Sequence, residues 1–336
     1  MTSRFRPWGP LQWLLPKLPI QQWALLGVLG TEDRCTAVLS VMDQSLTSRR
    51  FLKIMDPHVS PGESIDNRLN VIQRRLVDAG TSVQDIRTVE LLENIDAMRE
   101  ELELFLANSG PNIVFDISSM PKWWSFPMIR FLMESDRVET LVVTYTSALS
   151  YGRRLSSDPK ALGRLPTFDE PRVSDRYDEV IIGVGFAPLG LKDLFEENVG
   201  KIRYLFPFPP GPPNFHRNWH FLRSLNEEVE NRALTAEDRW HVHMYDVPSA
   251  FDALCKATGS GNQSCALAPF GPKTLSLAMC LFALAVDGAG KEPVHVFYTQ
   301  PQRYALDYTT GIGSVDGVAD IKGYCLRIAG RDLYTL

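Results

Sequence analysis

Met120-Pro121-Lys122-Trp123-Trp124-Ser125-Phe126-Pro127-Met128-Ile129-Arg130-Phe131 has a degenerate copy in Gly271-Pro272-Lys273-Thr274-Leu275-Ser276-Leu277-Ala278-Met279-Cys280-Leu281-Phe282. Pro, Lys, Ser, Met and Phe recur at one offset of 151 residues. Each copy follows an apolar run that predicts a buried strand, at residues 112–117 and 264–268, and each opens a stretch of helical periodicity. The sequence therefore predicts the same strand–loop–helix turn twice, with a lysine at each helix start.

Other landmarks repeat in the same order. Leu25-Leu26-Gly27-Val28 corresponds to Ile181-Ile182-Gly183-Val184, and Tyr145-Thr146-Ser147 to Tyr298-Thr299-Gln300, each set after an apolar strand-like run. Between these landmarks the pattern predicts paired elements: helices at 64–78 and 219–232, strands at 88–92 and 241–246, and short helices at 95–107 and 249–257. Strands that alternate with helices and are apolar along their length indicate parallel sheets covered on both faces.

The predicted fold is α/β, with two tandem Rossmann-like domains that arose by internal duplication. The expected division is an N-terminal arm at 1–20, a first domain at 21–150, a linker at 151–177 and a second domain at 178–336. Residues 320–336 are expected to add an antiparallel hairpin to the second sheet. The proline-dense segment 206–218 predicts a stiff loop that either caps the second domain or acts as a lid or docking loop.

Composition sets limits on function. The chain has 336 residues, a net charge of −5 and 44% hydrophobic residues, which argues against a protein that mainly coats nucleic acid. No apolar run is long enough to span a membrane. The five cysteines form no CxxC pair, so we expect buried free thiols and a cytoplasmic location. His216 with His220 and His241 with His243 have metal-compatible spacings, yet they lack recognised partner ligands, and we assign no metal and no cofactor.

The duplicated turns suit an anion. A lysine at a helix N-terminus joins exposed N–H groups and the positive end of the helix dipole. Ligands of open parallel sheets bind beyond the carboxyl ends of the strands, where the predicted loops are rich in Gly, Ser, Thr and Lys. The expected ligand-binding residues are Ser118, Ser119, Lys122, Thr146, Ser147, Gly185, Gly271, Lys273, Thr299 and Gln300. For the two serines, capping of the following helix is the alternative to ligand contact.

Catalytic motifs are scarce. The sequence has no Walker A motif and no G-x-S-x-G elbow, and residues 183–190 match a dinucleotide fingerprint only loosely. No histidine lies in the nearby loops of the first repeat to activate Ser118 or Ser119. A role without catalysis is therefore favoured.

The paired domains, the ligand loop after a central strand and the lysine that opens the next helix resemble the CRISPR-associated Rossmann fold (CARF) and the related SAVED-type sensors of bacterial antiphage systems. The resemblance implies binding of a linear or cyclic oligonucleotide signal, with Lys122 and Lys273 in the position of the family's loop lysine and Ser118 and Ser119 near its hydroxyl position. The family's glycine- and threonine-rich loop is replaced here by Ser-Ser-Met-Pro-Lys and Pro-Phe-Gly-Pro-Lys. The two halves also differ, which favours an asymmetric ligand or one active half.

Three functions remain open. The chain is a sensor or regulatory subunit that passes a nucleotide-derived signal to a separate effector protein, a metal-independent phosphodiesterase of the ring-nuclease kind, or a structural subunit of a larger defence complex. Homo- or hetero-oligomers fit each of them. A plugged cleft would select the structural subunit.

Overall fold

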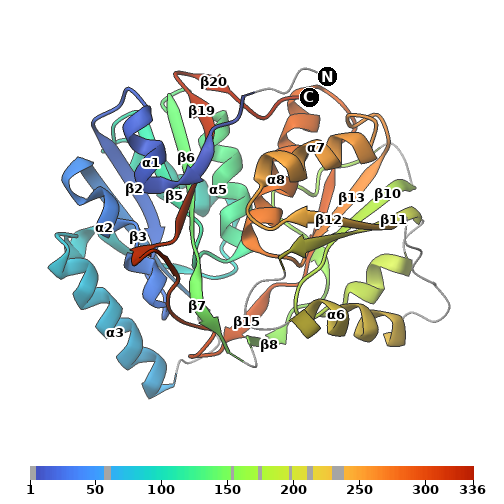
Figure 1. Ribbon diagram of the computed structural model, residues 1–336, viewed down its shortest axis with the longest axis horizontal. Helices are drawn as coiled ribbons and strands as arrows, with labels where there is room; N and C mark the ends of the chain where they lie inside the picture. Colours follow the sequence, from blue (N-terminus) through green and yellow to red (C-terminus); the bar gives the residue numbers. More distant parts are fainter. Residues whose placement is uncertain are drawn as a thin grey trace. The chain divides into compact units, whose positions relative to one another are not determined.

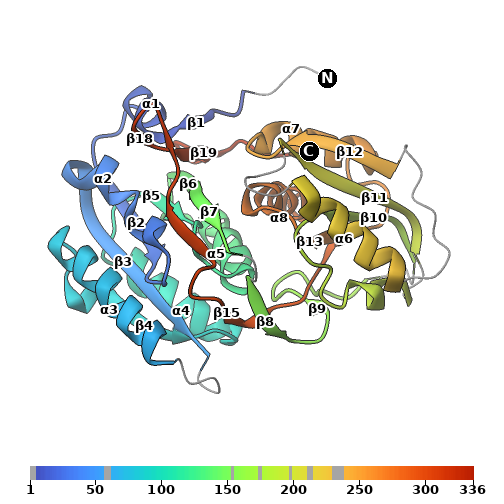
Figure 2. The same cartoon turned by 60° about the horizontal axis from the view of Figure 1, so that its bottom comes forward.

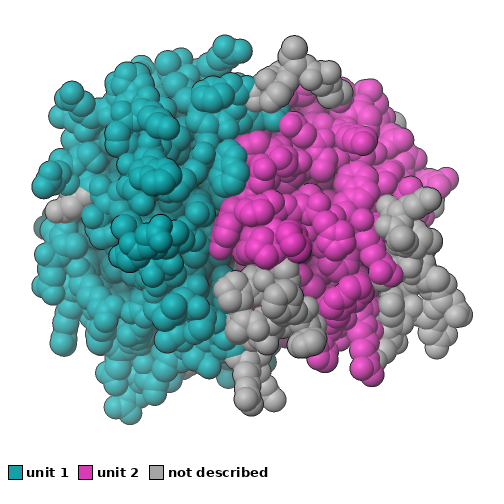
Figure 3. All heavy atoms as spheres, in the orientation of Figure 1, with its two compact units in different colours: residues 1–158, 301–333 teal, residues 159–300, 334–336 magenta. Residues whose placement is uncertain are grey.

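Parallel strands form the centre of each half of the chain (Figure 1). The computed structural model describes residues 5–56, 62–152, 155–172, 176–196, 199–209, 215–228 and 238–336. It divides into two units, coloured separately in Figure 3: unit 1 is residues 1–158 with 301–333, and unit 2 is residues 159–300 with 334–336. The fold class is α/β with mostly parallel central sheets.

Unit 1 has five parallel strands in the order β6-β5-β2-β3-β4. Their bounds are β2 (Trp23–Val28), β3 (Leu46–Met55), β4 (Ile86–Glu90), β5 (Asn112–Asp116) and β6 (Thr140–Thr146). Antiparallel strands extend the sheet beyond β6: β19 (Ile321–Ile328), then β1 (Trp8–Pro10), with β20 (Arg331–Asp332) also paired to β19.

Helices cover both faces of this sheet (Figure 2). One face buries α1 (Leu11–Leu14), α2 (Leu39–Met42) and α3 (Glu63–Asp78) in a shared apolar cluster with β2, β5, β6 and β19. The chain reverses direction across the sheet after β4. Right-handed crossovers therefore place α4 (Ile95–Leu106) and α5 (Lys122–Glu134), which contact each other, on the opposite face.

Unit 2 has the order β12-β11-β10-β13-β14-β9, parallel except for β9. Its strands are β9 (Gly163–Arg164), β10 (Tyr177–Gly183), β11 (Val199–Phe208), β12 (Arg239–His243), β13 (Cys265–Pro269) and β14 (His295–Tyr298). The short helix η5 (Leu191–Glu196) and α6 (Phe215–Glu228) pack on one face. The contacting pair α7 (Val247–Ala257) and α8 (Lys273–Gly288) follows the reversal of strand order, as in unit 1.

The five parallel strands of the two units follow one order. Counted along the chain, each sheet reads 5-4-1-2-3, with the reversal between the first and fourth strands. The prediction that a lysine starts the helix after each of the two strands is confirmed. Helix α5 begins at Lys122 after β5, and α8 begins at Lys273 after β13. Both helices start behind a proline, Pro121 or Pro272, without a side-chain cap.

Two predictions at the chain ends were wrong. The C-terminal hairpin joins the first sheet and not the second, because β19 lies between β6 and β1 with Ile321 opposite Thr146 and Tyr324 opposite Val143. Residues 5–20 are also more than an arm. Leu11 and Leu14 are buried beside β19, and a side chain at Gly323 would meet both of them.

The predicted linker and proline loop are more structured than expected. Segment 151–177 contains β8 (Ser156–Pro159), which pairs with β15 (Pro301–Tyr304), and β9. At the proline-rich segment, Phe206–Phe208 belongs to β11, where Phe206 is buried in the same apolar cluster as α6 and Phe208 is exposed. The stretch 210–214 lies outside the described residues, and α6 begins at Phe215. No described helix has the length and apolar character needed to cross a membrane.

Candidate functional site

The switch point of unit 1 lies between β2 and β5, where the strand order reverses and open α/β sheets bind their ligands. The loops that leave these strands touch each other. A Cβ built on Gly30 would lie 3.5 Å from Cys35 Sγ and 3.8 Å from Ser119 Cβ. Burial raises the pKa of the Cys35 thiol to about 11, so this cysteine stays protonated where it lines the two loops.

Ser118 holds the ends of two strands together. Its hydroxyl donates to Asp116 Oδ1 at 2.5 Å and accepts from the Thr146 N–H at 2.7 Å. The hydroxyl of Thr144 also donates to Asp116 Oδ1, at 3.1 Å. Burial raises the pKa of Asp116, although the hydrogen bonds from Ser118 oppose this. Ser118 is fully buried and caps no helix, so the capping interpretation was wrong, while its contact with a ligand stays a prediction.

Ser119 and Lys122 lie on the turn itself. The Ser119 hydroxyl is buried beside Cys35 without a hydrogen bond of acceptable geometry, whereas Lys122 is 8% exposed at the first turn of α5. Among the described residues, Ser119 and Thr146 are predicted ligand residues of unit 1 whose buried hydroxyls make no hydrogen bond of good geometry.

An internal ion pair fills the next part of the site. Arg34, 1% exposed, donates from Nε to Glu32 Oε2 at 2.9 Å and from Nη2 to the same oxygen at 2.7 Å. Its Nη1 donates to Tyr145 OH at 3.3 Å and to the Thr146 carbonyl at 3.2 Å. Thr309 donates to the same Glu32 oxygen. Burial opposes the charge of Arg34, but the neighbouring Glu32 carboxylate raises the pKa of the guanidinium above its ordinary value.

The Glu32–Arg34 pair and Thr309 hydrogen-bond with one another beside the end of β6. The Glu32 carboxylate receives what a bound phosphate would receive from Arg34 and Thr309. Ser147, predicted to face the ligand, donates instead to Asp320 Oδ2 at 2.6 Å. The switch point of unit 1 is thus closed by its own side chains.

The switch point of unit 2, between β10 and β13, is closed by its backbone. A Cβ on Gly185 would lie 1.9 Å from the Phe270 carbonyl oxygen, and one on Gly271 would lie 3.1 Å from the Val184 carbonyl. The Phe270 ring lies 5.5 Å from the ring of Tyr298. These two glycines allow close contact of two loops, which leaves no space for a ligand between them.

The remaining predicted residues of unit 2 do not form one open site. Thr299 and Gln300 are each 1% exposed after β14. Lys273 is half-buried at the start of α8. The copies of the Pro-Lys turn therefore share their backbone position, and their surroundings differ.

Unit 2 contains a second buried polar group. Tyr177 OH lies 2.5 Å from His295 Nδ1, and His295 Nε2 lies 2.7 Å from the Glu170 carbonyl oxygen. Because a carbonyl only accepts, Nε2 carries the proton and Nδ1 accepts from the tyrosine. Burial lowers the pKa of His295, so the ring is a neutral link between β14 and the segment before β10.

Sequence reasoning missed Glu32, Arg34 and Thr309 as parts of the site. A signal existed for the first two, because the charged triplet Glu32-Asp33-Arg34 follows closely on the buried strand β2. Thr309 carried no such signal, since it reaches Glu32 from 277 residues away. Among the described residues, no three His, Cys, Asp or Glu side chains gather in a geometry that could hold a metal ion.

Comparison with models of known families, and with proteins of curated function, gives no match. Among solved structures, the chain is similar to a functionally unknown protein of Pseudomonas aeruginosa PAO1 and to a putative universal stress protein of Pseudomonas aeruginosa UCBPP-PA14. Each is 9% identical, with 84% of this chain and 94% of the other covered, at a TM-score of 0.24. A ketoreductase from the first module of phoslactomycin biosynthesis in Streptomyces sp. HK803 is 12% identical, with 84% and 68% covered, at a TM-score of 0.21. Likenesses of this size carry no functional argument.

Proposed function

We propose that this chain is a non-catalytic binding protein, a structural or regulatory subunit whose two α/β units hold surfaces for other macromolecules. The observation that carries the proposal is the closure of both switch points, by the Glu32–Arg34 pair in unit 1 and by the Gly185–Phe270 contact in unit 2. Ligand-binding α/β proteins keep this place open. A bacterial defence complex as the setting rests on the sequence resemblance alone.

We further propose that the two units descend from one duplicated Rossmann-like unit. The support is the shared strand order together with the repeated Pro-Lys turn at the same helix start. In this view the second copy lost its ligand loop first, because Phe270 stands where the first copy has Ser119.

A second candidate function is nucleotide sensing by unit 1 alone, with transfer of the signal to an effector protein. One observation favours it: the Ser119 hydroxyl lacks a hydrogen bond and lies three residues before Lys122, at the N-terminus of a long helix. A phosphate bound at this turn would take the place of the Glu32 carboxylate beside Arg34, and both groups are negatively charged. The phosphodiesterase alternative gains no such support, since Ser118 is fully buried and hydrogen-bonded to Asp116.

Calorimetric titration of the purified protein with mononucleotides and with linear and cyclic oligonucleotides distinguishes these functions. The binding-protein proposal predicts no heat of binding, no shift in melting temperature and no turnover. Sensing predicts binding that Lys122→Ala and Ser119→Ala each weaken, the former about tenfold to a hundredfold from a lost charge-assisted contact of about 1.5–3 kcal/mol. Lys17→Ala, an exposed lysine of the same unit, is the matched control. Binding with that pattern of losses would overturn the main proposal.

A further inference from the structure

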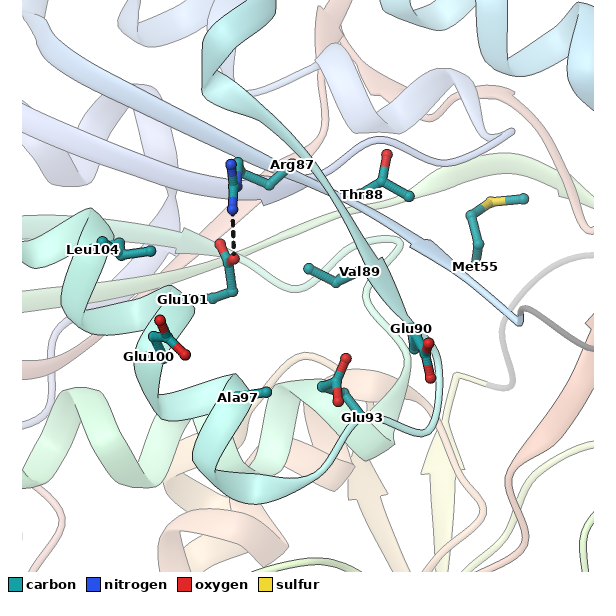
Figure 4. Close-up of a pocket in the computed structure, with 10 residues that line it drawn as sticks. All are labelled: Met55, Arg87, Thr88, Val89, Glu90, Glu93, Ala97, Glu100, Glu101 and Leu104. Carbon is teal, nitrogen blue, oxygen red and sulfur yellow. Dashed lines mark hydrogen bonds and ion pairs between the residues drawn. The ribbon is translucent and has the colours of Figure 1, made fainter.

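A trough of about 650 Å³ runs between strand β4 and helix α4 of unit 1 (Figure 4). Its walls are the outer side of β4 and the adjacent face of α4. The lining residues are Met55, Arg87, Thr88, Val89, Glu90, Glu93, Ala97, Glu100, Glu101 and Leu104. None of them belongs to the switch point.

One wall of the trough is a strand with a vacant edge. β4 is the last strand of its sheet among the described residues, paired only with β3. The Leu91 N–H bonds to the Met55 carbonyl, so by strand alternation residues 87, 89 and 91 turn their backbone groups toward β3. Glu90 and Thr88 turn theirs outward. The Glu90 carbonyl accepts from Trp124 Nε1 at 3.0 Å, which leaves Thr88 with a donor and an acceptor that face the trough side.

Negative charge predominates around this edge. Four glutamates and one arginine line the trough, and the arginine, Arg87, is already paired with Glu101 at 3.2 Å. Glu90 and Glu100 are exposed, and Glu93 is half-buried. The floor is apolar, with Val89 9% exposed and Leu104 44% exposed.

We propose that this trough binds an extended basic segment of a partner protein, which adds a strand beside β4. This inference rests on the proposed role as a binding protein. Backbone hydrogen bonds to Thr88 supply the pairing, and alternate side chains of the segment divide between two environments: lysine or arginine on the face of the strand that carries Glu90, and apolar side chains on the face toward α4, on Val89 and Leu104. Strand β4 is five residues long, which corresponds to a partner stretch of about 17 Å.

The charge pattern decides against other occupants. An acidic segment or a nucleic acid would meet the surplus of glutamates, and like charges placed opposite each other are unfavourable. A second copy of the chain that paired β4 with β4 would bring the same glutamates face to face. A basic strand is the complementary partner.

Fluorescence anisotropy with a labelled eight-residue peptide of alternating lysine and valine tests the proposal on the full chain. The expected result is saturable binding that weakens as salt rises, with no binding of the corresponding glutamate–valine peptide. Glu90→Lys/Glu100→Lys should weaken binding at least tenfold. The charge-matched control, Asp78→Lys/Asp136→Lys, changes exposed carboxylates outside the trough and should leave binding unchanged.

A third variant tests the strand pairing itself. Thr88→Pro removes an outward N–H and no bond to β3, so the sheet tolerates it, and it should weaken the lysine peptide while the melting temperature stays unchanged. Equal binding of both peptides, insensitivity to the charge reversal, or dimerisation of the wild type that Thr88→Pro abolishes would each overturn the proposal. Nucleotide titration involves none of these residues. The trough can therefore fail its test while the proposed binding role stands.

Discussion

Replacement of Arg34 by methionine should be among the most destabilising single changes in unit 1. Methionine keeps much of the side-chain volume but leaves the Glu32 carboxylate, whose side chain is 11% exposed, without its cation. Loss of one partner from a buried ion pair costs about 3–5 kcal/mol. Total stabilities are about 5–15 kcal/mol, so the variant should unfold at a much lower urea concentration.

The companion variants separate the ion pair from simple loss of packing. In Glu32→Gln/Arg34→Met no buried charge is left, and removal of a whole buried pair is often close to neutral. The double variant should therefore regain a large part of the stability that Arg34→Met loses. Arg303→Met is the control, because its pair with Asp158 at 2.8 Å joins side chains that are 59% and 53% exposed, and it should cost less than about 1 kcal/mol.

Urea unfolding followed by tryptophan fluorescence measures these changes, since Trp23 and Trp124 are fully buried in unit 1. If Arg34→Met costs less than about 1 kcal/mol, or if the two single changes add up in the double variant, the pair does not close the switch point as argued. Additivity is the sharper of the two outcomes, because contacting charges should couple.

Two further predictions concern unit 2. Gly185→Ala should cost about 3 kcal/mol, because its Cβ would lie 1.9 Å from the Phe270 carbonyl oxygen, a backbone atom that cannot rotate away; Gly288→Ala, with nothing within 4 Å, should be neutral or stabilising in the same thermal melt, and equal effects would refute the close contact. The lowered pKa of His295 predicts that the free energy of unfolding falls as pH drops below about 6.5, since the unfolded state then binds a proton that the folded ring, acceptor for Tyr177, disfavours. His295→Phe should flatten that part of the stability–pH curve, and an unchanged slope in the variant would contradict the assignment.

Local pattern was enough to predict many elements. Apolar runs marked β5 and β13, and the lysines marked the starts of α5 and α8. Strand β3 escaped detection because Arg49, Arg50 and Lys53 flank its short buried stretch of Phe51 and Leu52. The hydrophobic pattern of a strand reflects how its residues are buried, and β3 is only partly buried, so its pattern is weak.

The pattern of a strand does not show which sheet the strand joins. Residues 321–328 have the alternation of a strand, but nothing in that alternation indicates β6 of unit 1 in preference to a nearby strand of unit 2. The pairing of Ile321 with Thr146 spans more than half of the chain. Such contacts depend on the whole fold.

The site shows the same limit at the level of side chains. The sequence placed Ser118, Ser119 and Lys122 correctly on one turn after β5. It could not show that Ser118 turns inward to Asp116 while the hydroxyl of Ser119 stays unpaired. Loop composition predicts which groups are near a ligand position, whereas the direction of each group depends on neighbours such as Arg34.

The insertion of residues 159–300 between the two parts of unit 1 has a consequence for synthesis on the ribosome. Among the described residues, strand β1 pairs with β19 alone, and this partner emerges more than 300 residues later. At about 5–20 residues per second, the nascent first unit waits roughly 10–30 s between residue 158 and the end of β19. During that interval unit 2, whose strands are contiguous in the chain, can complete its own sheet, while the β6 edge and the apolar side of α1 remain uncovered. Unit 2 is therefore expected to complete its sheet before unit 1 does, and a nascent chain stalled before residue 321 exposes an open sheet edge to chaperones.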